Sequence, residues 1–215
     1  MKFRCERDAL VEQLGTASRA VSSRGGALPV LTGIHLKAHE DVLTMTGSDL
    51  EITVKASVPV AVSEPGEAVL PSRIAVDIIR SLDSGAIEIE VSGDEAKISG
   101  GRSQFSVRTL PVDDFPSLSD PTGDEVTVAT SDLAAGLKQV VRAASGDDAR
   151  PILTGVLMSA EDGGLRLVAT DSYRLAVRDL PEATVLSEGQ KVLVPSRALD
   201  ELGRVLGDSE EVTVR

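Results

Sequence analysis

An internal repeat limits the fold of this chain more than any other feature of its sequence. Pro29 followed by Leu31-Thr32-Gly33 recurs as Pro151 followed by Leu153-Thr154-Gly155, and Pro71-Ser72-Arg73 recurs as Pro195-Ser196-Arg197. The matched segments keep their order and lie 122–124 residues apart. Such self-similarity at a nearly fixed period marks a structural unit that is present more than once.

The repeat predicts how the 215 residues are divided. We expect one domain at residues 1–118 and a second, similar domain at residues 125–215. The stretch Asp113–Asp124 is rich in Pro, Ser, Gly and Asp, so we place a linker within it, at residues 119–124. Nothing in the second copy corresponds to Ser92–Leu110, and we therefore expect the second domain to be incomplete at its C-terminal end.

Each copy predicts an α+β domain in which two helices pack on antiparallel sheets. Apolar residues recur at helical spacing in four segments and alternate in the others. The predicted helices are Arg7–Val21, Ser72–Leu82, Ser131–Ala144 and Ser196–Leu206. The predicted strands are Lys2–Cys5, Ile34–Ala38, Val42–Thr46, Glu51–Val58, Ala68–Leu70, Ile87–Val91, Ala96–Ser99, Gln104–Thr109, Glu125–Val128, Val156–Ser159, Leu165–Ala169, Tyr173–Leu180 and Lys191–Val194.

Helical projection gives each helix an apolar side and a basic side. In the second helix Ile74, Ala75, Ile78 and Leu82 are predicted to face inward, opposite two arginines. The repeat reproduces the basic side, because each arginine of the second helix has a counterpart in the fourth. The cations predicted to face outward on the last three helices are Arg73, Arg80, Lys138, Arg142, Arg197 and Arg204.

The charge of the chain divides between helices and the rest. The whole sequence carries −12, which argues against indiscriminate binding to nucleic acid or to anionic membranes. Residues 1–24, 71–82, 131–150 and 195–206 together carry +3, and the remainder carries −15. A mixed-charge, solvated helix surface explains this equally well, since Asp200 and Glu201 lie beside the arginines of the fourth helix.

Catalytic and metal-binding patterns are absent from the sequence. It has no phosphate-binding loop, no dinucleotide fingerprint and no metalloprotease motif. His35 and His39 have no third ligand nearby, and Cys5, the one cysteine, is predicted to be a buried strand residue. The pairs Asp113-Asp114 and Asp147-Asp148 are interpreted as solvated loop residues. We therefore expect a protein that is not an enzyme and holds no metal or cofactor. No apolar run is long enough to span a membrane, which favours a cytoplasmic location.

One segment of the second copy is a candidate for binding a protein partner, although a tyrosine in such a place more often packs within its own domain. The sequence Thr170–Ala176 holds the only tyrosine, Tyr173, next to Arg174 at the start of a predicted strand. Packing within the domain is the alternative interpretation. Tyrosine and arginine are nevertheless the residues that most often anchor protein partners.

Several motifs together resemble the bacterial DNA polymerase III beta subunit family, the sliding clamps. Those of the first domain are Met1-Lys2-Phe3 with Glu6-Arg7, Leu28–Leu31, Leu43–Glu51, Pro71-Ser72-Arg73 and Arg102–Pro111 with Asp114-Phe115-Pro116. Those of the second are Pro151–Val156, Ala169–Ala176 and Val194–Arg197. The resemblance covers the whole chain and implies a third domain, absent here, with two subunits closing a ring around duplex DNA. It implies a non-catalytic processivity factor whose helices line the hole.

The resemblance also implies site residues. Arg24, Arg73 and Arg197 match DNA-facing positions of the family, whereas Asp147, Pro151 and Ile152 replace residues that contact DNA in some members. The predicted DNA-binding set is Arg24, Arg73, Arg80, Lys138, Arg142, Arg150, Arg197 and Arg204. The family's peptide pocket is similar at five positions here, to which we add Ser172; the predicted set is Leu153, Thr170, Ser172, Tyr173, Arg174 and Leu175.

The partners implied by the resemblance are double-stranded DNA, the DNA polymerase III alpha subunit and other polymerases, the clamp loader, and a second subunit in a homodimer ring. The ring would form near Arg102–Thr109, and no membrane is involved. Two alternatives stay open at this stage. One is a peptide-binding scaffold that does not encircle DNA, and the other is a carboxylate-based hydrolase that uses Asp147 or Asp171.

Overall fold

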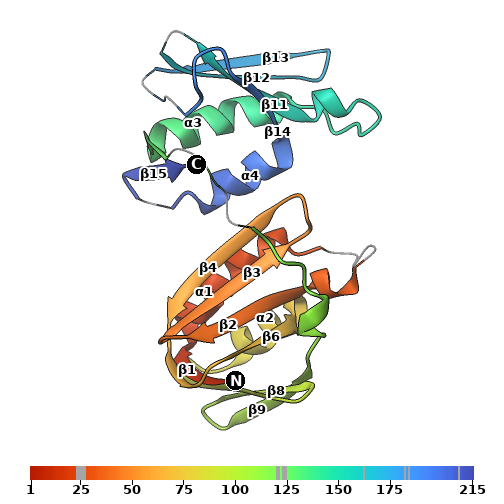
Figure 1. Ribbon diagram of the computed structural model, residues 1–215, viewed down its shortest axis with the longest axis vertical. Coiled ribbons are helices and arrows are strands. Elements are labelled where there is room, and N and C mark those ends of the chain that lie inside the picture. The colour runs from red at the N-terminus through yellow and green to blue at the C-terminus, as the bar shows by residue number, and fades with distance from the viewer. Residues whose placement is uncertain are drawn as a thin grey trace. The chain divides into compact units, whose positions relative to one another are not determined.

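The structure, a computed structural model, describes residues 1–22, 28–119, 122, 125–161, 163–181, 183, 185–207 and 209–215. The chain forms two compact units, Met1–Leu118 and Ser119–Arg215. Unit 1 runs from red to green in Figure 1, and unit 2 runs from green to blue.

The described residues of unit 1 form two antiparallel sheets and two helices. The strands are β1 (Lys2–Glu6), β2 (Gly33–His39), β3 (Val42–Ser48), β4 (Thr53–Pro59), β5 (Ala61–Glu64), β6 (Gly66–Pro71), β7 (Ala86–Ser92), β8 (Glu95–Gly100) and β9 (Ser103–Arg108). The helices are α1 (Arg7–Ala17) and α2 (Ser72–Ser81), with short 3-10 turns η1 (Ser18–Ala20), η2 (Pro29–Thr32) and η3 (Val112–Asp114). The strand orders are β4-β3-β2-β6 and β5-β1-β7-β8-β9.

Strand alternation places the core of unit 1 between these sheets and the helices. In β2 and β3, Leu36 pairs with Met45 and both are buried, whereas the adjacent Lys37 and Thr44 pair on the opposite face. Helices α1 and α2 lie behind this sheet in Figure 1. Their inward residues join the core, and removing each large side chain from water contributes about 1.5–3 kcal/mol.

Unit 2 repeats most of this arrangement. Its strands are β10 (Val126–Ala129), β11 (Gly155–Glu161), β12 (Gly164–Thr170), β13 (Leu175–Leu180), β14 (Lys191–Pro195) and β15 (Glu211–Val214). Its helices are α3 (Thr130–Val140) and α4 (Ser196–Val205), with 3-10 turns η4 (Val141–Ala143) and η5 (Pro151–Leu153). The sheet order β13-β12-β11-β14 matches β4-β3-β2-β6 position by position, and the pair β10-β15 matches β1-β7.

The predicted faces of α2 are partly wrong. Ile74, predicted to face inward, is 52% exposed, whereas Val76 and Ile79 are buried in the core. Both Ile74 and Ile79 lie near the edges of the apolar stripe in a helical projection. Which edge of the stripe is buried depends on the side from which the sheet packs against the helix. The sequence of the helix alone does not specify that side.

Several predicted boundaries also differ; the helix predicted over Ser131–Ala144, for example, ends at Val140. The strands expected from Glu51 and Tyr173 begin two residues later, at Thr53 and Leu175, because the preceding residues form tight turns. The strand β5 was not predicted; it pairs with β1 at the sheet edge. Helix α1 ends at Ala17 and continues to Ala20 only as a 3-10 turn.

The first part of the predicted linker stretch Asp113–Asp124 packs into unit 1. Val112 and Phe115 contact the small buried cluster Val30, Leu31 and Val69, and Leu110 continues the chain along β6 through a bridge to Val69. The segment packs against unit 1 because of its apolar side chains. Their burial contributes more free energy than ordering the segment costs in conformational entropy.

Cys5 is buried in β1, as predicted. Burial raises the pKa of its thiol to about 11, so it stays protonated at neutral pH. Within the described ranges, no group of three or more His, Cys, Asp or Glu side chains is arranged to hold a metal ion. In the same part of the chain, none of the helices has the length and apolar character needed to cross a membrane.

Candidate nucleic-acid and peptide interfaces

Basic side chains occupy equivalent positions on the second helix of each unit. Arg73 and Arg80 are exposed on α2, and Arg197 and Arg204 are exposed at the same repeat positions on α4. Arg80 extends over α1 at Gly15, where an added Cβ would lie 3.7 Å from the Arg80 guanidinium. The duplication thus places a pair of arginines on the surface of both units, as the helical projection predicts.

In unit 2 the two helices enclose a shallow groove of about 220 Å³ that is lined by cations. Lys138 of α3, Arg142 of η4 and Arg204 of α4 surround it, and Leu137 and Leu199 form part of its apolar lining. Side chains of this kind suit contacts with phosphate oxygens, which position a protein on DNA without reading sequence. The structure therefore brings together three of the predicted DNA-binding residues.

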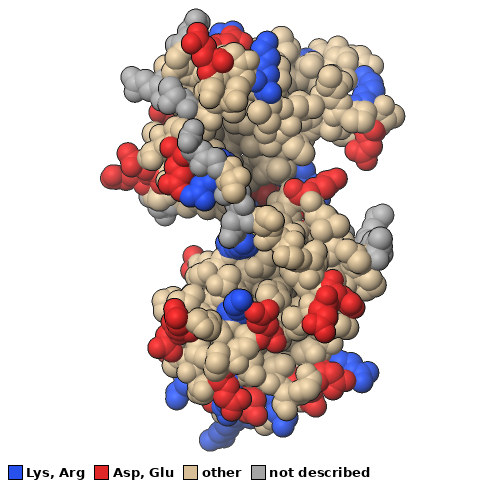
Figure 2. All heavy atoms as spheres, in the orientation of Figure 1, with Lys and Arg blue, Asp and Glu red and all other residues tan. Residues whose placement is uncertain are grey.

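Arg204 is not a simple free cation in this groove. Its guanidinium lies 2.8 Å from Asp200 and 2.9 Å from Glu201, one turn earlier on α4. Each exposed pair of this type contributes little to stability, but the carboxylates offset the positive charge. On the face of the molecule in Figure 2, blue and red side chains are likewise mixed over both units.

Arg150 lies in the loop before η5, not on a helix; its Nε donates to Asp147 at 3.0 Å, and its Nη1 donates to Ser172 at 3.3 Å. The backbone N–H of Ala149 and then Arg150 lower the pKa of the Asp147 carboxyl. Arg150 thus joins the region of the predicted peptide site. Arg24 lies outside the described residues.

A tight turn between β12 and β13 holds four of the predicted peptide-binding residues. The carboxylate of Asp171 accepts hydrogen bonds from the backbone N–H groups of Tyr173 and Arg174, each at 2.9 Å. The hydroxyl of Thr170 donates to the carbonyl of Arg174 at 2.7 Å, and Ser172 has a positive φ of 79°. Hydrogen bonds from the backbone N–H groups of Arg174 and then Tyr173 lower the pKa of the Asp171 carboxyl.

The equivalent turn of unit 1 has the same geometry. Asp49 accepts from the N–H groups of Glu51 and Ile52, and Leu50 has a φ of 75°. A short acidic side chain that bonds backbone groups two and three residues ahead is the local cause of such a turn. The sequence motif Ser/Thr-Asp therefore explains why both strands begin after it.

Apolar side chains are exposed around the turn of unit 2. Tyr173 is 93% exposed, Leu175 is 65% exposed and Ile152 of η5 is 73% exposed. Along the same sheet face, strand pairing aligns Leu193, Leu157, Val168 and Val177 in one row across β14, β11, β12 and β13. A cluster of exposed apolar residues is typical of a protein interaction site.

Sequence reasoning missed Val177 and Leu193 as members of this surface. Both are half exposed, at 51% and 44%, and lie on the strands that flank the sheet. Strand β13 has apolar residues on both faces, so alternation does not tell which face is exposed. Pairing β13 with its repeat partner β4 would have matched Val177 to the exposed Lys55, whereas Leu193 matches Val69, which is buried, and so had no such signal.

Family models and known proteins match both units. Residues 1–119 match the DNA polymerase III beta subunit N-terminal domain, and residues 127–215 match its central domain. The chain is 36% identical over 215 residues to the beta sliding clamp of Streptomyces coelicolor, covering 99% of this chain and 56% of the relative. It is 35% identical over 226 residues to that of Bacillus subtilis, covering 99% of this chain and 58% of the relative.

Solved structures agree. The DNA polymerase III subunit beta of Pseudomonas aeruginosa and the DNA polymerase sliding clamp of B. subtilis each superpose with a TM-score of 0.91 at 34% identity. Each covers 99% of this chain, which spans 59% of either structure. The fold is therefore the sliding-clamp fold, as the sequence predicts, in two successive copies. The chain belongs to the DNA polymerase III beta subunit family.

Proposed function

We propose that this chain is part of a sliding clamp, a non-catalytic processivity factor that encircles duplex DNA and tethers the replicative polymerase. The observation that carries the proposal is the family match over both units, together with the duplicated arginines Arg73 and Arg80 on α2 and Arg197 and Arg204 on α4. Such contacts with phosphates do not depend on base sequence, which is what a sliding protein requires.

Within this proposal the two predicted surfaces have separate roles. The groove of Lys138, Arg142 and Arg204 faces DNA, and the surface around Tyr173 and Leu175 binds peptides of its partners. These partners are the DNA polymerase III alpha subunit, other polymerases and the clamp loader. Two subunits form a homodimeric ring in the cytoplasm, and retention on DNA by topology keeps a tethered polymerase at high effective concentration.

The test compares closed and cut DNA. The complete protein is loaded onto a circular plasmid by its clamp loader, and the complexes are then diluted. We expect the protein to stay on the closed circle and to leave within minutes once a restriction enzyme linearises it. Equal loss from the circular and the linear forms would contradict encirclement.

A peptide-binding scaffold without DNA encirclement is the second candidate. It is favoured by the ion pairs of Arg204 with Asp200 and Glu201 and by the large exposure of Tyr173. This candidate predicts that reversing the charge of Arg73 and Arg197 leaves function intact. The clamp proposal predicts that the same reversal weakens loading and reduces its dependence on salt.

A further inference from the structure

Arg80 and Arg204 occupy the same position of the repeat but have different surroundings. Arg80 of α2 extends over α1 at Gly15, where its guanidinium lies 3.7 Å from the position of an added Cβ. Among the residues that the structure describes, no carboxylate forms an ion pair with Arg80. The guanidinium of Arg204 instead lies 2.8 Å from a carboxylate oxygen of Asp200 and 2.9 Å from one of Glu201. The two arginines thus differ in whether their charge is balanced on their own helix.

The sequence explains why the side chain of Arg204 stays on α4. The counterpart of Gly15 in α3 is Lys138, so an arginine that crossed to α3 would approach a like charge. The counterpart of Asp200 in α2 is Val76, which is buried in the core. An acidic residue four positions before an arginine pairs favourably with it on a helix surface. This pair is therefore available in α4 and not in α2.

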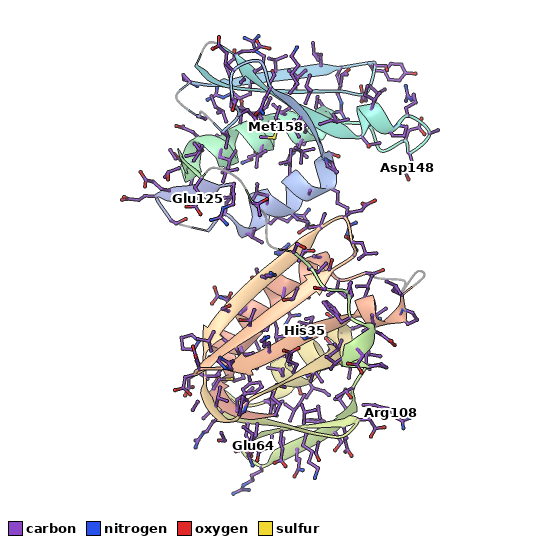
Figure 3. All side chains as sticks on the ribbon, in the orientation of Figure 1. His35, Glu64, Arg108, Glu125, Asp148 and Met158 are labelled. Carbon is purple, nitrogen blue, oxygen red and sulfur yellow. The ribbon has the colours of Figure 1, made fainter. Side chains whose placement is uncertain are left out.

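The carboxylates that hold Arg204 differ in their exposure to water. The side chain of Glu201 is 16% exposed, whereas those of Asp200 and Arg204 are 52% and 53% exposed. Charges that are partly shielded from water are screened less by salt than fully exposed ones. The cluster lies on the exposed side of the helices, since their apolar sides face the sheet, where Met158 of β11 points toward them in Figure 3.

These carboxylates change what the groove between α3 and α4 offers to a phosphate. Lys138 and Arg142 line the groove and have no ion pair among the described residues. Arg204 lines it too, but brings two negative charges together with its positive one. A phosphate oxygen must displace both carboxylates from the guanidinium before it can form the paired hydrogen bonds that arginine offers.

We propose that Asp200 and Glu201 are positioning residues that hold Arg204 on α4 and thereby weaken the contact of unit 2 with DNA. The inference rests on the proposed clamp function and adds a restraint to it. A protein that slides must break its phosphate contacts at every step, and carboxylates that compete for Arg204 make that contact easier to break. Arg80 has no such competitor, so the two units contribute unequally to the friction of sliding.

The test measures how fast the complete protein slides. Fluorescently labelled protein is loaded by its clamp loader onto DNA that is then stretched between blocked ends, and single-molecule imaging gives its diffusion coefficient at several salt concentrations. For D200N/E201Q we expect the coefficient to fall about two- to fivefold, the range that one exposed ion pair provides. Its salt dependence should become steeper, because a new phosphate contact releases counterions. Circular dichroism spectra establish that each variant is folded.

The matched control is a second arginine of unit 2 that pairs with two carboxylates. Arg166 lies on the sheet, 2.6 Å from Asp179, and also pairs with Glu161. The variant E161Q/D179N makes the same change in net charge as D200N/E201Q and should leave the diffusion coefficient unchanged. Adding R204A to the wild type and to D200N/E201Q completes a double-mutant cycle. We expect most of the slowing to disappear without Arg204, because the released arginine causes it.

The proposal would be overturned by any of three results. An unchanged diffusion coefficient in D200N/E201Q would show that the carboxylates do not restrain Arg204. Equal slowing in D200N/E201Q and E161Q/D179N would indicate an effect of net charge. Equal slowing with and without Arg204 would show that the carboxylates simply repel DNA. Escape of the wild-type protein from the blocked DNA would instead refute the clamp function itself, so the two failures are distinguishable.

Discussion

The ring of Tyr173 is exposed to solvent because hydrogen bonds to Asp171 fix the backbone of this residue in a turn. The N–H groups of Tyr173 and Arg174 are both bound to Asp171, so the side chain projects from a rigid turn and is 93% exposed. Because the backbone of the turn is already fixed, only the side-chain torsions of Tyr173 lose freedom when a partner covers the ring. Such residues often dominate the binding energy of an interface.

Replacing this ring should therefore affect binding and leave stability unchanged. For Tyr173→Ala we expect at least about tenfold weaker binding of a peptide from the replicative polymerase, measured by fluorescence anisotropy. The free energy of unfolding should change by less than about 0.5 kcal/mol, since the ring packs on little else. Leu50→Ala, in the equivalent turn of unit 1, is the matched control and should leave the affinity unchanged. Equal loss in both variants would contradict this role for Tyr173.

Gly47 of β3 has no room for a side chain. A Cβ at this position would lie 2.1 Å from the carbonyl oxygen of Ala17, which belongs to the backbone at the end of α1. We expect Gly47→Ala to lower the free energy of unfolding by about 3 kcal/mol, because helix and sheet must separate to admit the methyl group. Urea denaturation measures this change.

The control for Gly47 is Gly203 in α4, where nothing lies within 4 Å of an added Cβ. Gly203→Ala should raise the stability of unit 2 by up to about 1 kcal/mol through helix propensity. If Gly47→Ala and Gly203→Ala changed the free energy of unfolding in the same direction, the close approach of α1 to β3 would not be the cause of the loss at Gly47.

At the scale of single residues, sequence reasoning identified what is chemically distinctive. It singled out Tyr173 as a candidate partner residue and Cys5 as a buried thiol, and the structure shows the first exposed and the second buried. It failed for Ile74, because an apolar residue at the edge of a stripe is buried or exposed according to the position of a neighbouring element. It also gave no sign that Arg150 reaches Ser172, since that contact joins two loops that are distant in sequence.

At the scale of elements, the turn formed by Asp171 makes the stability of the start of β13 depend on pH. Hydrogen bonds from Arg174 and Tyr173 lower the pKa of this carboxyl in the folded state. A group whose pKa is lower when folded stabilises the fold above its ordinary pKa of about 4, and this contribution is lost as the pH falls through the folded value.

We therefore expect unit 2 to lose stability on acidification from about pH 7 to about pH 3, and Asp171→Asn to lose less over the same range. Asparagine keeps one acceptor oxygen but does not titrate in this range. Urea denaturation at several pH values measures the difference. Parallel curves for the two proteins would show that this carboxyl does not contribute to acid sensitivity.

The helices and most strands could be predicted because their patterns are local. Both second helices begin directly after a proline, at Ser72 and Ser196, as the repeated motif Pro-Ser-Arg indicates. Strand β5 was missed because its four residues lie at a sheet edge and show no clear alternation. The packing of Phe115 on His35 was equally inaccessible, since it depends on where the chain turns after β9.

At the scale of the whole molecule, the residues that the structure describes form one main hydrophobic core in each unit, and these two cores have no residue in common. Leu10 and Leu167 are completely buried, one in each core. We expect Leu10→Ala and Leu167→Ala each to destabilise by about 2–5 kcal/mol the unit that contains the substitution. Amide hydrogen exchange read out by mass spectrometry should show lost protection in that unit alone. Equal loss of protection in both units would contradict independent cores.

The repeat made the architecture predictable at this scale, because a strand in one copy predicts its counterpart in the other. The order β13-β12-β11-β14 follows β4-β3-β2-β6 without exception. The repeat does not predict which side chains occupy the outward positions, because the two copies differ there. His35 and Leu157 occupy matching positions, yet one faces a polar cleft and the other belongs to an apolar row.

This division between inward and outward positions has a consequence for how such a chain can change. Substitutions at outward positions such as Lys55 or Val177 change the surface of a sheet without touching the buried residues that define the fold. Duplicated sheets thus allow one copy to acquire a new binding preference while the other retains its own. Exchanging outward rows between the copies would accordingly exchange the surface chemistry of the two sheets and leave both cores unchanged.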